Sequence, residues 1–440
     1  MKYDRFFLLA KEAGIEEAEL YISTSKELSF SYFHGEIDKY SDNNGFSILA
    51  RGLINGKFGA AIADSWSNQK AEYLVKEIKA NAGVIENEDP QFIFEGSKNY
   101  KKINTFNPSL SKVSIEEKME KCLQLEDEIR KSDKRIIEVE SVEYEESESS
   151  VLLLNSRGLK LQQKSNYYVY IGAAIAKQGE QVKSGYEIFL DNDFSKFDVK
   201  KLAKQVVDAT VGQLGGEPCE SATYKAVLSP DVVTSFLTAY ISSADAEEVQ
   251  KQSSFFIGKL HEKVASNKVT VEDRPLQRNV FSRWFDDEGV ATFNKPIIKN
   301  GKLETYLYNL TTAAKDGVES TANGYRSGGS MGTAPAFLVM KPGKKSQEEL
   351  FKEVGEGVYI TDVSGLHAGL NPQSGNFSLQ STGFLIKNGK KDRPLDIITV
   401  SGNLLELFKD VIEVGSDSKV SPRAVSCPSI LIKKLVVSGK

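Results

Sequence analysis

Cysteine and histidine are scarce in this chain, with three of each among 440 residues. The cysteines lie far apart, at Cys122, Cys219 and Cys427, and no CxxC pair occurs. This spacing excludes a disulfide framework and argues against a cysteine-based zinc module. Isolated thiols are typical of a reducing compartment, so we expect the protein in the cytoplasm. Any mechanism that needs histidine must use one of the three residues or take histidine from another chain.

Long apolar runs and an excess of positive charge are also missing. No stretch approaches the ~18 consecutive apolar residues of a membrane-spanning helix, so no membrane contact is expected. The start, Met1–Arg5, leads into a short amphipathic helix and does not predict a signal peptide. With 56 basic and 61 acidic side chains the net charge is −5, which offers no general surface for nucleic acid. The phosphate-binding patterns GxxxxGKS/T and GxGxxG do not occur.

The composition that remains, 40% hydrophobic and 27% charged, is typical of a globular protein, here long enough for about three domains. In the first unit, residues 1–95, alternating strands such as Glu19–Phe33 precede an amphipathic helix. The apolar residues of that helix recur at helical spacing, at Ala71, Leu74, Val75, Ile78 and Ala82. This order predicts an α+β fold in which a helix covers one face of an antiparallel sheet.

The same order of elements returns in residues 96–216, after a polar linker at Glu86–Val113. A capping box begins a helix at Ser114. Strands are then predicted at Ile136–Tyr144, Val151–Asn155, Leu159–Lys164, Tyr167–Ala176 and Ser184–Phe189. Residues 217–440 are richer in strands and turns and predict a β-rich C-terminal domain.

His261-Glu262 is half of a zinc-protease motif on an expected helix. Ala265 and Ser266 stand where the second histidine would be, so this segment supplies one ligand only. We interpret it as a solvated surface pair.

Ser330 stands in a GxSxG pattern, and Asp362 and His367 follow it in hydrolase order. A nucleophile elbow needs a strand before the serine and a helix after it, and the sequence predicts neither here. A flexible glycine-rich loop near a ligand is the favoured interpretation, and a stand-alone serine-type hydrolase is kept as an alternative.

The segment Gly365–Ser378 combines turn formers with amide side chains between two expected strands. Such a loop exposes backbone donors and acceptors that can recognise an extended peptide. The candidate peptide-binding residues are His367, Asn371, Ser374, Asn376 and Ser330. The alternative is a tight hairpin in which asparagine and glycine serve the turn alone.

Several motifs in one order resemble the TldD/PmbA family across nearly the whole chain. They are Ile298–Leu307, Asn371–Ser378, Gly383–Gly389, Ile398–Leu404 and Pro428–Ile432. The family was first described as candidate modulators of DNA gyrase. It contains zinc-binding TldD-type subunits and PmbA-type (TldE-type) partners, so the resemblance implies a heterodimeric protease for small or unfolded peptides.

In the zinc-binding subunits a His-Glu-x-x-x-His helix and a later cysteine bind the metal. The resemblance places these positions near Leu237–Ser242 and Val414–Ser416, where this chain has no histidine, glutamate or cysteine. Zinc catalysis needs about three protein ligands and a base. The chain therefore resembles the PmbA-type subunit. This implies no catalytic residue and no cofactor of its own, with zinc in a TldD-type partner. A homodimer and a protein-binding modulator of DNA gyrase stay open as alternatives.

Overall fold

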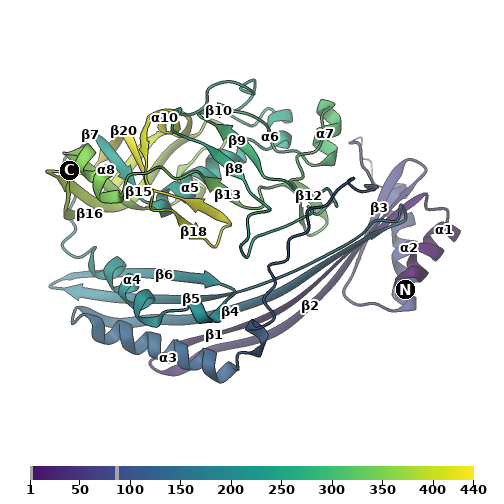
Figure 1. Cartoon of the computed structure of the whole chain (residues 1–440), viewed down its shortest axis with the longest axis horizontal. Helices are drawn as coiled ribbons and strands as arrows, with labels where there is room; N and C mark the ends of the chain where they lie inside the picture. Colours follow the sequence, from purple (N-terminus) through teal and green to yellow (C-terminus); the bar gives the residue numbers. More distant parts are fainter. Residues whose placement is uncertain (1–2, 85–88) are drawn as a thin grey trace.

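The computed structural model describes residues 3–84 and 89–440; Met1, Lys2 and the first residues of the expected linker, 86–88, lie outside these ranges. The α+β class is confirmed. A long antiparallel sheet carries helices on one face, and a β-rich C-terminal part lies over the other face (Figure 1). None of the helices in the described ranges is long and apolar enough to cross a membrane.

The N-terminal sheet has six strands in the order β3-β2-β1-β4-β5-β6. Their bounds are β1 Glu17–Phe33, β2 Glu36–Ile54, β3 Lys57–Ala63, β4 Ile136–Asn155, β5 Lys160–Gln178 and β6 Gln181–Asp191. β1 pairs antiparallel with β4, from Glu19 opposite Asn155 to Tyr32 opposite Val142. The two expected units therefore contribute strands to one continuous sheet. Their division between residues 95 and 96 stays a prediction.

The strands are longer than the sequence predicts. The expected pair Ile136–Tyr144 and Val151–Asn155 is one strand, β4, and the next expected pair is likewise one strand, β5. The stretch Glu145–Ser150 has no apolar alternation, and so the sequence signals no strand there. It is a strand because β1 and β5 pair with it on both sides, and backbone pairing needs no apolar side chain.

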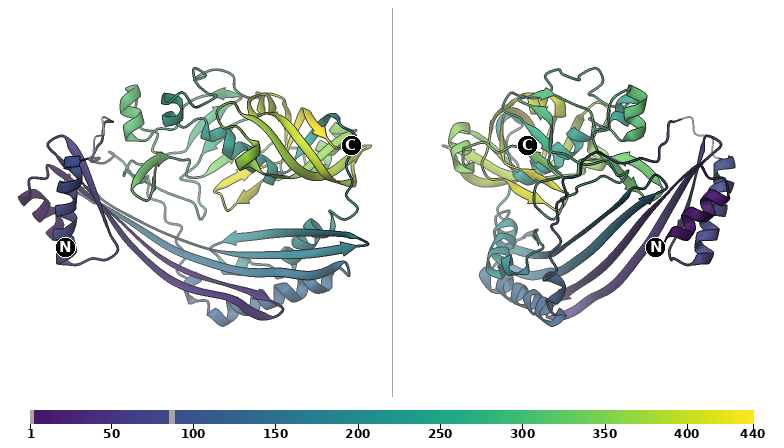
Figure 2. Two further views of the ribbon diagram at one scale, coloured as in Figure 1. Left: turned by 180° about the vertical axis from the view of Figure 1, so that it is seen from behind. Right: turned by 45° about the vertical axis from the view of Figure 1, so that its right-hand side comes forward.

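Helices cover one face of this sheet (Figure 2). They are α1 Asp4–Glu12, α2 Asn68–Val84, α3 Ile115–Ser132 and α4 Val199–Val211. The five apolar residues predicted on one face of α2 are all buried, which confirms that pattern. Ser114 caps α3, because its hydroxyl accepts a hydrogen bond from the Glu117 N–H, which is the serine half of the predicted capping box.

The C-terminal part contains two further six-stranded sheets. The first consists of β7 Ala222–Leu228, β14 Gly357–Ser364, β15 Asn376–Lys387, β16 Lys390–Asn403, β17 Val411–Val414 and β20 Ile430–Ser438. β16 pairs with both β15 and β20, so this sheet closes on itself. The second consists of β8 Val271–Asp273, β9 Lys295–Lys299, β10 Lys302–Leu303, β13 Leu338–Met340, β18 Lys419–Ser421 and β19 Val425–Cys427.

Short helices and one hairpin complete the C-terminal part. The helices are α5 Pro230–Ser242, α6 Ala246–Gln250, α7 Leu310–Asp316, α8 Gln347–Val354, α9 Leu366–Gly369 and α10 Leu404–Lys409. β11 Gly324–Ser327 and β12 Ser330–Thr333 form the hairpin. α5 packs with both sheets in one apolar core.

Residues 89–107 belong to the connection between α2 of the first unit and α3 of the second unit. Asn155 Nδ2 donates to the Phe94 carbonyl at 2.6 Å, which ties this segment to the end of β4. Tyr100 Oη donates to the Gly289 carbonyl at 2.7 Å, which ties it to the C-terminal part. The segment therefore fixes the loop around Gly289 against the sheet.

Candidate functional site

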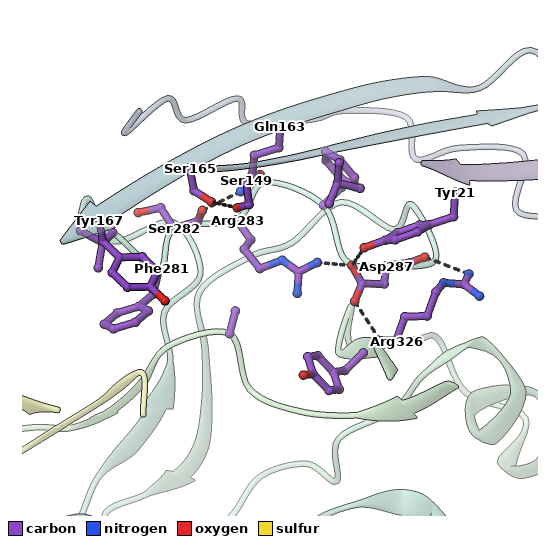
Figure 3. Close-up of a pocket in the computed structure, with 15 residues that line it drawn as sticks. Tyr21, Ser149, Gln163, Ser165, Tyr167, Phe281, Ser282, Arg283, Asp287 and Arg326 are labelled. Atoms are coloured by element: carbon purple, nitrogen blue, oxygen red, sulfur yellow. Dashed lines mark hydrogen bonds and ion pairs between the residues drawn. The ribbon is translucent and has the colours of Figure 1, made fainter. Parts of the chain in front are cut away.

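A pocket of about 380 Å³ lies between the N-terminal sheet and the C-terminal part (Figure 3). Side chains of β1, β4 and β5 form its floor, and the loop 280–287 with the β11–β12 hairpin forms its roof. The lining residues are Tyr21, Ser149, Val151, Gln163, Ser165, Tyr167, Val280, Phe281, Ser282, Arg283, Phe285, Asp287, Tyr325, Arg326 and Ala336.

The floor is built by the alternation of side chains along paired strands. Ser149 on β4 lies opposite Ser165 on β5, and their hydroxyl oxygens are 2.8 Å apart. Gln163, two residues earlier on the same face of β5, holds the roof in place. Its Nε2 donates to the Ser282 carbonyl at 2.7 Å, and its Oε1 accepts from the Trp284 N–H at 3.0 Å. The Gln163 amide thus donates one hydrogen bond to the loop backbone and accepts one from it, as the backbone of a neighbouring strand would.

Asp287 is the buried centre of the roof. Its Oδ1 accepts hydrogen bonds from Tyr21 Oη at 2.7 Å and from Arg283. Its Oδ2 accepts from the backbone N–H of Arg326 at 2.8 Å. Burial raises the pKa of Tyr21, and the charge of Asp287 raises it further, so the phenol stays protonated and donates. Both carboxylate oxygens of Asp287 are therefore occupied by donors of the protein itself.

Arg326 joins the hairpin to the sheet. Its Cζ lies 4.9 Å from the centre of the Tyr21 ring, and its Nη2 donates to the Asp287 carbonyl at 3.2 Å. The same nitrogen lies 3.4 Å from Glu19 Oε1 on β1, an oxygen that also accepts from Arg51 on β2 at 2.7 Å. The side chains of Arg326 and Glu19 are 4% and 1% exposed, so water screens their attraction only weakly.

Two more buried carboxyl groups, Asp286 and Glu288, meet behind the pocket at Gly324. A Cβ atom at Gly324 would lie 2.8 Å from Glu288 Oε2 and 3.0 Å from Asp286 Oδ2, so a larger residue there would displace the Glu288 side chain. Asp286 Oδ2 accepts the Gly324 N–H at 2.9 Å, and Glu288 Oε2 accepts the Leu310 N–H at 2.8 Å. Burial raises the pKa of both carboxyl groups. The charge of Asp286 raises the pKa of Glu288 further, to about 8.

The substitution Glu288→Gln is expected to flatten the pH dependence of stability. The folded pKa of about 8 lies above the ordinary value of 4.5, so the folded chain keeps a proton that the unfolded chain releases. Stability therefore falls as the pH rises through this interval, and glutamine removes that loss while still accepting the Leu310 N–H. Urea unfolding at pH 5 and pH 9 measures the effect. The control Glu180→Gln, in an exposed turn, should keep the wild-type slope. A Glu288→Gln slope equal to that of the wild type would contradict the prediction.

Ser330 begins β12 at the exposed end of the hairpin, where its Oγ donates to the Ser327 carbonyl at 2.9 Å. The local geometry is a hairpin and not the strand–helix turn of a nucleophile elbow. Asp362 lies on β14 and His367 in α9, and within residues 3–84 and 89–440 no hydrogen bond joins either residue to Ser330. The hydrolase order in the sequence is therefore not a hydrogen-bonded triad in the fold.

In the segment Gly365–Ser378 the amide groups serve the turn. Asn371 Oδ1 accepts the N–H groups of Gln373 and Ser374, both at 3.0 Å. Asn376 Oδ1 accepts from Asn403 Nδ2 at 2.8 Å. These contacts support the turn alternative. The side chains of the candidates all reach solvent, namely His367, Asn371, Ser374, Asn376 and Ser330. Their role in peptide binding stays a prediction.

Core residues fill the positions where the resemblance places a zinc motif. On α5, Leu237, Tyr240 and Ile241 are buried, and Tyr240 Oη donates to the Val264 carbonyl at 2.6 Å. After β17, the Gly415 N–H donates to the Ser429 carbonyl at 2.7 Å. These groups do not fit zinc, which takes cysteine, histidine or carboxylate ligands. In the part of the chain that the structure describes, no group of three or more such side chains could hold a metal ion.

His261 and Glu262 lie in a loop, so the prediction of a helix there is wrong. The His261 N–H donates to the Leu303 carbonyl at 2.8 Å, and the Glu262 carbonyl accepts the Leu303 N–H at 3.0 Å. This bridge to β10 uses the backbone groups that a helix would need, and His261 has a φ of 66°. Both side chains are exposed, as the interpretation of a surface pair predicts.

Sequence reasoning alone does not find the pocket. The available signal is the run from Trp284 to Gly289, in which three acidic residues directly follow two aromatic ones. When the two aromatic side chains are buried, the carboxylates next to them are buried too, and buried carboxylates need hydrogen-bond donors or cations as partners. For Asp287 one partner, Arg283, directly precedes this run, but the other two, Tyr21 and Arg326, are far from it in the sequence.

Comparisons with known proteins identify the family to which this chain is similar. Family models described as the PmbA/TldA metallopeptidase central and C-terminal domains match residues 108–214 and 221–439. A "Metalloprotease PmbA homolog" from Buchnera aphidicola is 29% identical over 331 residues, 74% of this chain and 71% of that protein. A Thermotoga maritima crystal structure, described as a candidate modulator of a DNA gyrase, is 32% identical with a TM-score of 0.93, and 99% of each chain is covered. TldE from Thermococcus kodakarensis shares the fold over 100% of both chains, with a TM-score of 0.92 at 23% identity.

Proposed function

The chain belongs to the PmbA/TldD family, and from this premise we propose that it is the non-catalytic subunit of a family metallopeptidase complex. The complex processes or degrades small or unfolded peptides. A TldD-type subunit supplies the zinc ion and the residues that activate water, while this chain completes the complex and helps to hold the substrate.

The observation that carries the proposal is the composition of α5. A zinc peptidase needs ligands and a base that converge on one open position. Here the corresponding helix presents Leu237, Tyr240 and Ile241 to an apolar core, and Tyr240 stacks on Phe408 with 4.3 Å between ring centres. A metal site there would require replacing packed core residues, and so catalysis is assigned to another chain.

The pocket beneath the hairpin is the proposed contribution of this chain to substrate binding. It combines aromatic and aliphatic walls with polar groups held by hydrogen bonds, and ligand sites use such groups to orient what they bind. Cytoplasmic location is part of the same proposal. It is supported by three cysteines that are free and buried, at Cys122, Cys219 and Cys427.

Reconstitution with a TldD-type zinc subunit tests the proposal. The purified chain alone is expected to leave an unstructured peptide intact, and the mixture is expected to cleave it in a reaction that a chelator stops and added zinc restores. Mass spectrometry of the products measures cleavage, and size-exclusion chromatography distinguishes a mixed dimer from a homodimer. Full activity of the zinc subunit alone, or chelator-resistant cleavage by this chain alone, would overturn the proposal.

A protein-binding modulator of DNA gyrase is the second candidate, because the Thermotoga maritima relative carries that description. The net charge of −5 does not favour contact with DNA, so the contact would be with the gyrase protein. Affinity capture with the full chain separates the candidates. Recovery of gyrase without a zinc subunit supports the second, and recovery of a zinc subunit without gyrase supports the first.

A further inference from the structure

Arg283 has unused hydrogen-bonding capacity inside the pocket. A guanidinium offers several N–H donors in a planar fork. Among the described residues, Asp287 Oδ1 is the one acceptor that the Arg283 side chain reaches. The side chain is 27% exposed, and Figure 3 shows it extended across the pocket toward Asp287. Its other N–H donors are available to a bound molecule.

The charges that line the pocket favour an anion. Two arginines, Arg283 and Arg326, contribute to its lining, together with one aspartate, Asp287. Asp287 accepts one hydrogen bond from the Arg283 side chain, at Oδ1, while its Oδ2 accepts the Arg326 N–H, so the other N–H donors of Arg283 have no acceptor among the described residues. Arg326 is directed away to Glu19, at 3.4 Å. An anionic group next to Arg283 would complete the charge balance.

The remaining walls suit an apolar group attached to that anion. Phe281 and Tyr325 line the roof, and 48% of the Tyr325 surface is exposed although the ring is large and apolar. Ser149 and Ser165 share one hydrogen bond on the floor. Only one of these hydroxyls donates to the other, so the second proton is free for a ligand oxygen.

We propose that this pocket binds the free α-carboxylate of a peptide, with Arg283 as its ion-pair partner and Phe281, Tyr167 and Tyr325 around the last side chain. The inference rests on the proposed function, because it names the end of the substrate that this subunit holds. A volume of about 380 Å³ accommodates the last one or two residues of a peptide. Arginine suits this task because its fork matches the two oxygens of a carboxylate.

The first test varies the ligand and leaves the protein unchanged. Isothermal titration of the full chain compares N-acetyl-Ala-Phe, which has a free carboxylate, with its C-terminal amide. The acid is expected to bind about 10-fold or more tightly, the effect of one charge-assisted hydrogen-bond pair. Equal affinities would overturn the proposal. N-acetyl-Glu-Phe-amide tests a side-chain carboxylate, and binding as tight as that of the acid would also overturn it.

The second test varies Arg283. Arg283→Gln is expected to lower the affinity for the acid about 10-fold or more, to that of the amide, while Arg283→Lys retains part of it. Arg278→Gln is the matched control, because Arg278 is exposed and lies two residues before the loop 280–287, and it should bind like the wild type. Thermal unfolding confirms that each variant is folded, and Arg283→Lys preserves a cation beside Asp287. Wild-type affinity in folded Arg283→Gln would contradict the assignment.

These binding assays use the chain without any partner, so their failure is distinguishable from failure of the proposed function. If the acid and the amide bind alike while the reconstituted complex still cleaves peptides, only the carboxylate assignment falls. If the acid binds as expected while reconstitution gives no zinc-dependent cleavage, the pocket assignment stands and the peptidase proposal falls.

Discussion

Asp273→Ala is expected to lower the free energy of unfolding by about 3–5 kcal/mol, the range for removing one partner of a buried ion pair. Asp273, at the end of β8, is 0% exposed and pairs with Lys295 on β9 at 2.9 Å. Asn323 Nδ2 donates to it at 2.8 Å, and the N–H groups of Ala336 and Phe337 donate at 3.0 and 3.2 Å. Alanine would leave the buried Lys295 ammonium group without its counter-ion and the Ala336 and Phe337 N–H groups without their acceptor, and Asn323 Nδ2 would keep only the Ala334 carbonyl.

Urea unfolding followed by circular dichroism measures this loss. Asp392→Ala is the matched control, because Asp392 is exposed on β16, and its expected effect is within about 0.5 kcal/mol. A loss below about 1 kcal/mol in Asp273→Ala would mean that the site relaxes or admits water, and the role given to this ion pair would be wrong.

Arg326→Met is the second large effect, with an expected loss of about 2–4 kcal/mol. The substitution removes donors from Glu19 Oε1 and from the Asp287 carbonyl, both of which are buried. Glu19 would keep Arg51, and the Arg326 backbone N–H would still reach Asp287, so the loss is smaller than for an isolated pair. The hairpin that roofs the pocket would lose its tie to the sheet.

A double-mutant cycle with Glu19→Gln tests the coupling. Each single substitution leaves a buried charge with fewer partners, whereas the double substitution removes both charges of the pair. We therefore expect the double variant to lose at least about 1 kcal/mol less than the sum of the single losses. Additive losses, measured by urea unfolding, would show that Arg326 and Glu19 do not stabilise each other.

Local patterns in this chain predict the elements that depend on local rules. The helical spacing of apolar residues locates α2, and the predicted N-terminal cap at Ser114 locates the start of α3. The length of a strand is harder to predict from the sequence. The polar middle of β4 is a strand because β1 and β5 pair with it, and not because apolar and polar residues alternate there. The joining of both N-terminal units in one sheet depends on β1 pairing with β4, which no local pattern encodes.

In the candidate site, too, local patterns predict the turns but not the contacts between residues far apart in the sequence. The turn formers around Asn371 are visible in the sequence, but the structure engages their amides in the turn itself. The pocket residues carry no local motif. Tyr21 and Asp287 are 266 positions apart, and they are in contact because the C-terminal part packs against the N-terminal sheet. A carboxylate's partner in the fold cannot be identified from the residue type alone.

The zinc content of the purified chain tests the central claim most directly. After incubation with zinc and removal of free metal, elemental mass spectrometry should find far less than one zinc ion per chain. The complex with a TldD-type subunit should hold about one catalytic zinc ion, bound through the three protein ligands that such a site needs. This result would agree with an α5 that presents Leu237, Tyr240 and Ile241 to the core. One zinc ion bound per chain in the absence of any partner would contradict the account.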